Sequence, residues 1–163
     1  MNIPQTTIVN ESDRDVTFVR FYDAPRKTVF DAFSNADAVK QWWRIQDWKV
    51  IFCTLDFRPG GTWHYCLQGP EGQEHWAKAI YREIVEPERI VYMDGSSDAD
   101  GNDVQGLPPS LTTVTFAEQS GVTKLTAHIQ YASAADLEAV VARGMVQGFK
   151  QTLCLLETYL NNA

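Results

Sequence analysis

The chain has 163 residues, of which 44% are hydrophobic and 12% aromatic, so it can bury one complete core without a metal or a disulfide framework. Its 21 acidic and 14 basic residues give a formal charge of -7, and no cluster of lysines or arginines offers the concentrated positive field that a nucleic acid requires. No stretch approaches the roughly 20 apolar residues that span a bilayer. We therefore expect no nucleic-acid partner and no stable membrane insertion.

The beginning of the chain and its cysteines indicate a compartment. Residues 1–13 are polar and have neither the basic nor the apolar region of a secretion signal, which predicts a flexible lead and a cytoplasmic location. Cys53, Cys66 and Cys154 are odd in number and form no CxxC pair, which is typical of small buried side chains in a reducing environment. We predict a single domain over residues 1–163 without a cofactor.

The first elements are a strand and two short helices. Residues 16–22 are β-branched and aromatic and stop at a turn before Pro25, which predicts a strand. Pro25 can occupy the first turn of a helix, and apolar side chains then recur at helical spacing at Val29, Phe30 and Phe33. A second short helix is expected between residues 35 and 41.

The middle of the chain predicts an antiparallel meander. Six β-prone runs are separated by short turns rich in Gly, Pro and Glu, and they cover residues 48–54, 62–68, 76–85, 89–93, 111–118 and 122–131. Separators this short join antiparallel neighbours. The longer segment 94–110 is dense in Asp, Gly, Ser and Pro, which predicts a mobile loop at one mouth of the sheet.

The last part of the chain predicts one long amphipathic helix. Ser133 and Asp136 resemble a capping box, and the apolar stripe behind them comprises Leu137, Val141, Met145, Phe149, Leu153, Leu156 and Leu160. Gly144 and Gly148 each disfavour a helix by about 1 kcal/mol relative to alanine. They permit either a close approach to the sheet or to the short helices, or room for a ligand.

Alternation along the strands nominates the residues that face the helix. Trp63, Tyr65 and Leu67 share one face of their strand, and Ile129 and Tyr131 share the apolar face of the last strand. The residues predicted to line a cavity beneath the helix are Trp63, Tyr65, Tyr81, Tyr92, Phe116, Tyr131, Met145 and Phe149. Buried Tyr and Trp keep a hydrogen-bonding end, so this wall suits a flat ligand with few polar atoms. The alternative that these aromatics only form a core stays open.

Sequence motifs provide no catalytic residue and no metal site. His64, His75 and His128 lack the spacing of zinc ligands, and the nucleophile, phosphate-binding and metalloprotease motifs do not occur. Glu83 and His64 are the nearest candidates for a general acid or base, should the strand faces be the reverse of those assigned. We favour binding over catalysis.

Four segments carry a resemblance to a known family. They are RFYDAPRKTVFDAFSNADAVKQWW at 20–43, DFRPGGTW at 56–63, YREIVEPERIVY at 81–92 and MVQGFKQTL at 145–153. In this order and spacing the chain resembles the SRPBCC (START/Bet v 1-like) superfamily, in the branch named after the C-terminal domain of the activator of Hsp90 ATPase. The resemblance implies an α+β helix-grip fold, in which a curved six- to seven-stranded antiparallel sheet wraps around a long C-terminal helix above a deep hydrophobic cavity.

The same resemblance shapes the functional prediction. Members bind lipids, polyketides, hormones or aromatic products, and some cyclise or hydrolyse them. We predict a small hydrophobic or aromatic ligand, with Trp42 and Trp43 at the cavity entrance. The alternatives are a cyclase or hydrolase acting on such a molecule, and a chaperone-associated interaction module. Nothing in the chain matches the N-terminal stimulating domain of the co-chaperones, so Hsp90 is not predicted as a partner, and a homodimer is left open.

Overall fold

An eight-stranded antiparallel sheet forms the frame of the molecule. The computed structural model describes residues 6–162. The strand order is β1-β2-β8-β7-β6-β5-β4-β3, and every neighbouring pair is antiparallel. The strands are β1 (Thr7–Val9), β2 (Asp15–Tyr22), β3 (Lys49–Leu55), β4 (Thr62–Gln68), β5 (Glu74–Val85), β6 (Arg89–Ser96), β7 (Ser110–Gln119) and β8 (Val122–Tyr131).

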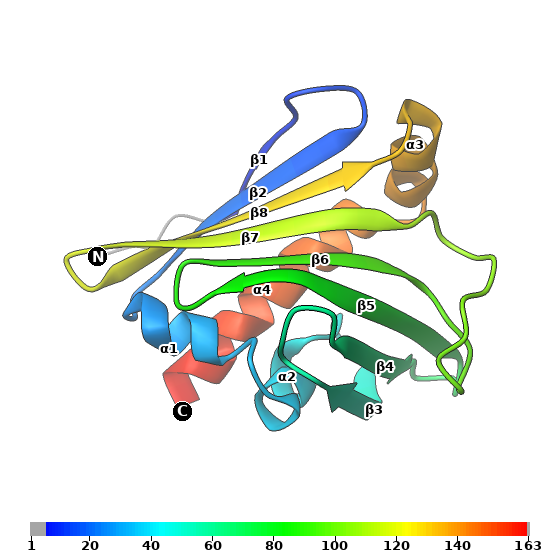
Figure 1. Cartoon of the computed structure of the whole chain (residues 1–163), viewed down its shortest axis with the longest axis horizontal. Coiled ribbons are helices and arrows are strands. Elements are labelled where there is room, and N and C mark those ends of the chain that lie inside the picture. The colour runs from blue at the N-terminus through cyan, green and yellow to red at the C-terminus, as the bar shows by residue number, and fades with distance from the viewer. Residues whose placement is uncertain (1–5, 163) are drawn as a thin grey trace.

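Four helices complete the fold. They are α1 (Arg26–Asp31), α2 (Ala36–Trp42), α3 (Ala134–Ala142) and α4 (Met145–Asn162). The sheet curves around α4, which crosses one of its faces, while α1 and α2 lie between β2 and β3 along the chain and near the C-terminal end of α4 (Figure 1). Irregularities in register between Val50 and Phe52 and between Tyr81 and Glu83 add twist to the strands that curve most. The predicted α+β helix-grip architecture is confirmed.

The strand count exceeds the predicted six to seven because the lead contains a strand. Residues 7–9 pair with β2, with Thr7 opposite Val19. The turn behind β1 is held by the Asp15 carboxylate, whose Oδ1 accepts from the backbone N–H of Glu11 at 3.0 Å and of Ser12 at 2.8 Å. The prediction of a flexible lead is wrong for residues 7–9, because a strand of three residues is too short to show an alternating hydrophobic pattern. Residues 1–5 of the predicted lead lie outside the described part of the chain.

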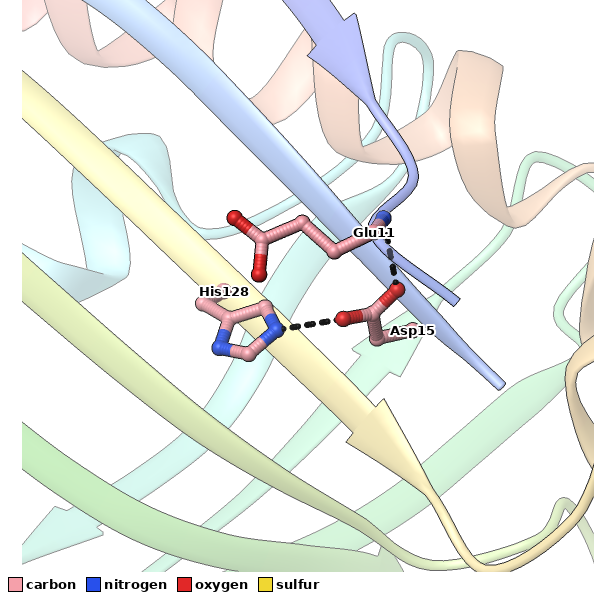
Figure 2. Close-up of side chains that lie close together, drawn as sticks. All are labelled: Glu11, Asp15 and His128. Atoms are coloured by element: carbon pink, nitrogen blue, oxygen red, sulfur yellow. Dashed lines mark hydrogen bonds and ion pairs between the residues drawn. The ribbon is translucent and has the colours of Figure 1, made fainter. Parts of the chain in front are cut away.

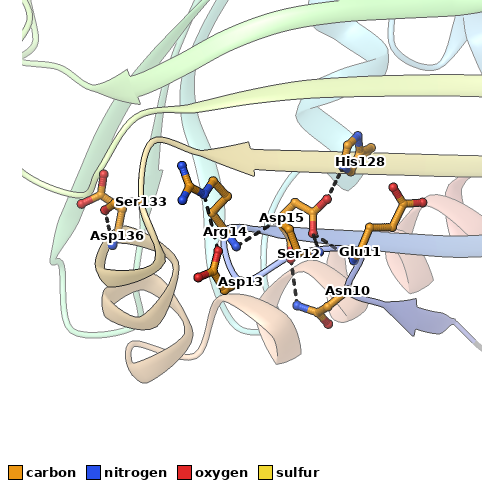
Figure 3. Close-up of polar contacts among 9 residues, drawn as sticks. All are labelled: Asn10, Glu11, Ser12, Asp13, Arg14, Asp15, His128, Ser133 and Asp136. Carbon is orange, nitrogen blue, oxygen red and sulfur yellow. Dashed lines mark hydrogen bonds and ion pairs between the residues drawn. The ribbon is translucent and has the colours of Figure 1, made fainter.

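The predicted single C-terminal helix is broken in two. Gly144 has a φ of +90°, a left-handed conformation that ends α3 before α4 begins at Met145. The predicted cap is confirmed, since the Ser133 hydroxyl accepts from the N–H of Asp136 at 3.1 Å (Figure 3). The apolar stripe continues across the break because both helices pack against the same sheet, and that continuity concealed the break in the sequence.

The segment predicted as a loop over 94–110 is shorter than expected. Strand β6 continues through Ser96 and β7 starts at Ser110, so Asp94 lies in a strand and pairs with Ser110. The remaining loop is fastened to the outer face of the sheet. Lys78 Nζ donates to the Gly101 carbonyl at 2.8 Å, and His64 Nε2 lies 3.0 Å from the Asp98 carbonyl.

The C-terminal half of α4 is the part that docks on the sheet. Leu153 and Leu156 are fully buried, and the hydroxyl of Tyr22 on β2 donates to the carbonyl of Leu153 at 2.8 Å. Arg20, also on β2, forms an ion pair with Glu157 at 3.3 Å. None of the helices in the described range 6–162 is long and apolar enough to cross a membrane.

The helix break makes a prediction with a definite sign. Nothing lies within 4 Å of a Cβ added at Gly144, so the effect of Gly144→Ala comes from its positive φ alone, and we expect a loss of about 1–2 kcal/mol in the free energy of unfolding. Gly144→Asn, which tolerates this conformation better, should lose less. Urea denaturation measures both; a gain of about 1 kcal/mol for alanine, as inside a continuous helix, would contradict the break.

Candidate ligand-binding site

A cavity of about 540 Å³ lies between the sheet and the N-terminal half of α4. Its wall comes from three regions: the inward faces of β4 to β8, the segments 43–48 and 107–108, and the α3–α4 junction. The aromatic and large apolar residues on it are Trp43, Ile45, Trp48, Tyr65, Leu67, Tyr92, Leu107, Ile129, Tyr131, Val140, Met145 and Phe149.

Small residues keep this volume open. On the sheet, Ala77 lies between Tyr65 and Ser96 in neighbouring strands, and all three line the cavity. On the helical side the wall contains Gly144 and Gly148. A Cβ at Gly148 would lie 3.3 Å from Cγ2 of Ile45, so the glycine also allows α4 to approach the segment after α2 closely.

Most of the residues predicted for the cavity lie on its wall. These are Tyr65, Tyr92, Tyr131, Met145 and Phe149, together with Trp43 of the predicted entrance. The Phe149 ring packs against Phe18 of β2 at a centroid distance of 4.7 Å and lies 6.1 Å from Trp43. Trp43 therefore joins the segment after α2 to α4 along one side of the cavity.

Trp63, Tyr81 and Phe116 do not line the cavity but belong to the solid core. Phe57 and Phe30 fill the space in front of two of them, at 5.2 Å from the ring of Tyr81 and 5.4 Å from the ring of Phe116, and Trp43 covers Trp63 at 4.7 Å.

Trp42, predicted at the entrance, is also fully buried in the core. Its indole N–H donates to the Ala32 carbonyl at 2.9 Å. Alternation along the strands therefore identified the inward faces correctly. The space in front of Trp63, Tyr81 and Phe116 is filled, however, by side chains from α1, from the end of α2 and from the β3–β4 turn.

One carboxylate lies on the cavity wall. Asp94 of β6 accepts a hydrogen bond of 2.6 Å from the Ser110 hydroxyl of β7, and Ser110 is paired in turn with Tyr131 of β8. Burial raises the pKa of Asp94 to about 6, and the hydrogen bonds with Ser110 offset part of that rise. The negative charge of Asp94 adds to burial in raising the pKa values of Tyr65, Tyr92 and Tyr131, the last to about 12. These groups therefore form one polar cluster on the cavity wall.

The other ionisable side chains on the wall do not pair with Asp94. Burial lowers the pKa of His75, so its imidazole is uncharged at neutral pH. Arg44 donates to the Trp48 carbonyl at 3.3 Å, and Arg143 is exposed at the end of α3. Within residues 6–162 no ion pair involves Asp94.

Sequence patterns did not reveal Asp94 and His75, because one predicted strand ends too early and the other begins too late. The predicted strands stopped at Met93 and began at Trp76, whereas β6 includes Asp94 and β5 includes His75. Alternation from Tyr92 to Asp94 and from Ala77 back to His75 would have found both. The two earlier candidates lie outside the cavity: Glu83 pairs with Arg89, and His64 packs beside Phe52 and Trp76.

A second group of ionisable side chains joins the start of β2 to β8. Glu11, Asp15 and His128 each place one metal-ligand atom within 4.8 Å of the others, and the carboxylate of Glu11 extends toward His128 (Figure 2). Both oxygens of Asp15 are engaged, however, since Oδ2 lies 2.8 Å from His128 Nε2 while Oδ1 binds the two backbone N–H groups (Figure 3). An ionised carboxylate only accepts, so His128 donates. The geometry is that of a structural hydrogen bond between the turn and β8.

Comparisons with known proteins place the chain among structures of the same fold. Residues 23–161 match the profile of the family described as "Activator of Hsp90 ATPase homolog 1-like protein". A solution structure from Arthrobacter aurescens has a TM-score of 0.89 at 22% identity, covering 96% of this chain and 92% of that one. A crystal structure of a protein from Mycobacterium smegmatis has a TM-score of 0.85 at 24% identity, covering 96% of each chain.

A third solved structure is somewhat more similar in sequence. A solution structure from Staphylococcus epidermidis has a TM-score of 0.80 at 28% identity, covering 96% of this chain and 94% of that one. No curated protein matches the chain.

The Asp15–His128 pair predicts a loss of stability in acid. The hydrogen bond from His128 is the main cause that lowers the pKa of Asp15 below 3.8. The ionised Asp15 therefore stabilises the fold fully above the pKa that it has in the unfolded chain, and this stabilisation disappears as the pH falls through the lower pKa of the folded chain. Asp15→Asn should reduce the free energy of unfolding by about 1–2 kcal/mol at neutral pH. Urea denaturation should show this deficit shrinking below the usual Asp pKa. Asp13→Asn is the control: it removes only an exposed ion pair with Arg14, so its free energy of unfolding should stay within about 0.5 kcal/mol of the wild type at every pH.

The raised pKa of Asp94 predicts that this residue makes the fold less stable as the pH rises, the opposite of Asp15. Because its folded pKa of about 6 exceeds the usual 3.8, the folded chain holds a proton that the unfolded chain releases between these values, and stability falls as pH rises through that window. Asp94→Asn does not titrate, so its free energy of unfolding relative to the wild type should be higher at about pH 7 than at about pH 4. Asp100→Asn in the exposed loop is the control. A difference between Asp94→Asn and wild type that does not change with pH would contradict the burial of this carboxylate.

Proposed function

The chain belongs to the activator of Hsp90 ATPase homolog 1-like family, and we propose that it is a cytoplasmic protein that binds a small hydrophobic or aromatic molecule between its sheet and α4. The observation that carries the proposal is the cavity, whose volume of about 540 Å³ lies within the range of about 300–1,000 Å³ typical of small-molecule sites. The family provides a fold suited to ligands, and the site on that fold must provide the specificity.

The composition of the wall supports an apolar ligand. Aromatic and aliphatic side chains surround the volume, so a ligand that fills it removes apolar surface from water on both sides, at about 25 cal/mol per Å². Trp43 and Phe149 offer aromatic rings against which a flat molecule can pack. The polar atoms are gathered around Asp94, which suits a ligand with a polar group at one end.

A second candidate function is acid–base catalysis on the bound molecule. The observation that favours it is the presence of two ionisable groups inside the cavity, Asp94 with a pKa raised to about 6 and His75 with a pKa lowered by burial. General acids and bases work best when their pKa lies near the operating pH. A cyclase or hydrolase acting on an aromatic or polyketide-like substrate would use Asp94 to move a proton.

The chaperone-associated alternative has less support. An interaction module would combine a filled core with a large exposed apolar surface, whereas this chain keeps an internal volume open. The large apolar side chains exposed in the described range are Val9, Ile51, Phe52, Ile80, Val104 and Val141. Only Ile51 and Phe52 are neighbours along the chain, on the edge strand β3.

Ligand-dependent stabilisation tests the binding proposal. Neutral aromatic alcohols, from 2-naphthylmethanol to three- and four-ring compounds, are titrated while thermal unfolding is followed. A compound present at about 100 times its Kd should add about 2.7 kcal/mol to the free energy of unfolding. Ala77→Leu places a larger side chain on the floor of the cavity and should abolish that increment.

The control makes the same chemical change elsewhere. Ala117 is exposed on β7, so Ala117→Leu should leave the response to each compound unchanged. If neither these alcohols nor the corresponding amines and carboxylates stabilise the wild type, or if Ala77→Leu responds as the wild type does, small-molecule binding in this cavity is refuted.

A further inference from the structure

Asp94 is a carboxylate without a charged partner in an aromatic cavity. It lines the cavity and accepts from Ser110 at 2.6 Å, a neutral hydroxyl. Carboxylates taken out of water are stable when they are paired with a cation and hydrogen-bonded. A neutral apolar ligand that filled the cavity would remove the remaining water from Asp94 and offer nothing in return.

The groups that face Asp94 from the surrounding elements are neutral. Ser110 on β7 donates to it, and Tyr65 on β4, Tyr92 on β6 and Tyr131 on β8 lie near enough for the charge of Asp94 to raise their pKa values. His75 on β5 is uncharged at neutral pH because burial lowers its pKa. Arg44 and Arg143 also line the wall, but within residues 6–162 neither forms an ion pair with Asp94, and Arg44 donates to the Trp48 carbonyl.

The tyrosine rings around Asp94 also favour a positively charged ligand. Aromatic rings attract cations through their π electrons, and they attract ammonium groups most strongly where water is excluded. Tyrosine hydroxyl oxygens add hydrogen-bond acceptors for an ammonium N–H. The net charge of -7 also favours the approach of a cation over that of an anion.

We propose that the ligand of this cavity carries a positively charged amine, which pairs with the Asp94 carboxylate while its hydrophobic body fills the apolar part beneath α4. This inference rests on the proposed binding function and assigns it a ligand class. The amine supplies the missing partner of Asp94, and its N–H groups reach the neighbouring oxygens. An anionic ligand would be repelled by Asp94, and a neutral one would leave the carboxylate unpaired.

Three probes with the same ring system test the charge preference. They are 2-naphthylmethylamine, 2-naphthylmethanol and 2-naphthoate, titrated by calorimetry against the intact protein at neutral pH. The amine should bind at least about tenfold more tightly than the alcohol, which is 1.4 kcal/mol. Asp94→Asn should remove this preference by weakening the binding of the amine, while the alcohol should bind as tightly as to the wild type or more tightly, because its binding no longer desolvates a charge.

The pH dependence gives a readout that needs no variant. The affinity of the amine should fall as the pH decreases through about 6, because protonation of Asp94 removes its charge, whereas the alcohol should bind as well or better in acid. His75→Gln separates the two titrating groups: whatever its effect on the affinity of each probe, the ratio of amine to alcohol affinity should still fall as the pH decreases through about 6.

The outcomes separate this inference from the function on which it rests. Equal affinities for amine and alcohol, an equal loss for both in Asp94→Asn, or tightest binding of 2-naphthoate would each overturn the amine proposal while leaving ligand binding intact. The amine proposal and the binding function would both be overturned if no probe bound and if the neutral aromatic alcohols affected the thermal unfolding of the wild type and of Ala77→Leu alike.

Discussion

The site depends on the way α4 is docked against the curved sheet. Its C-terminal half is anchored, because Leu153 and Leu156 are buried and Tyr22 donates to the carbonyl of Leu153 at 2.8 Å. Its N-terminal half starts anew after the left-handed Gly144, so it is not forced to continue the axis of α3. A helix fixed at one end over a concave sheet leaves a volume beneath the other end.

Side-chain size decides that this volume stays open at one end and is closed at the other. Near α1, Phe57 and Phe30 fill the space over Tyr81 and Phe116, at ring distances of 5.2 and 5.4 Å. Toward the α3–α4 junction the facing positions are small, as at Ala77 and Gly148. Interiors are normally packed to the density of organic crystals, so an open volume of about 540 Å³ with an apolar wall is the feature that most needs a ligand.

Membership of the family explains the fold and leaves the chemistry to individual residues. The aromatic wall selects for hydrophobic bodies in general, since burial of apolar surface is not directional. Asp94 is the group that can distinguish one such molecule from another, because an unpaired carboxylate in a water-poor site interacts strongly and differently with cations, neutral groups and anions. Its position next to Ser110 and three tyrosines places the same residue at the centre of both proposals, amine binding and proton transfer.

Local patterns in the sequence are sufficient for the antiparallel α+β fold, the cap at Ser133 and the inward faces of the strands, because alternation, helical spacing and capping are properties that neighbouring residues encode. Alternation was sufficient to place Tyr65 and Tyr131 toward α4. The three-dimensional packing fixed where the strands end, and with that the inclusion of Asp94 in the wall. It also decided which inward side chains meet empty space and which, like Trp63, meet another ring, since that depends on residues far away in the sequence.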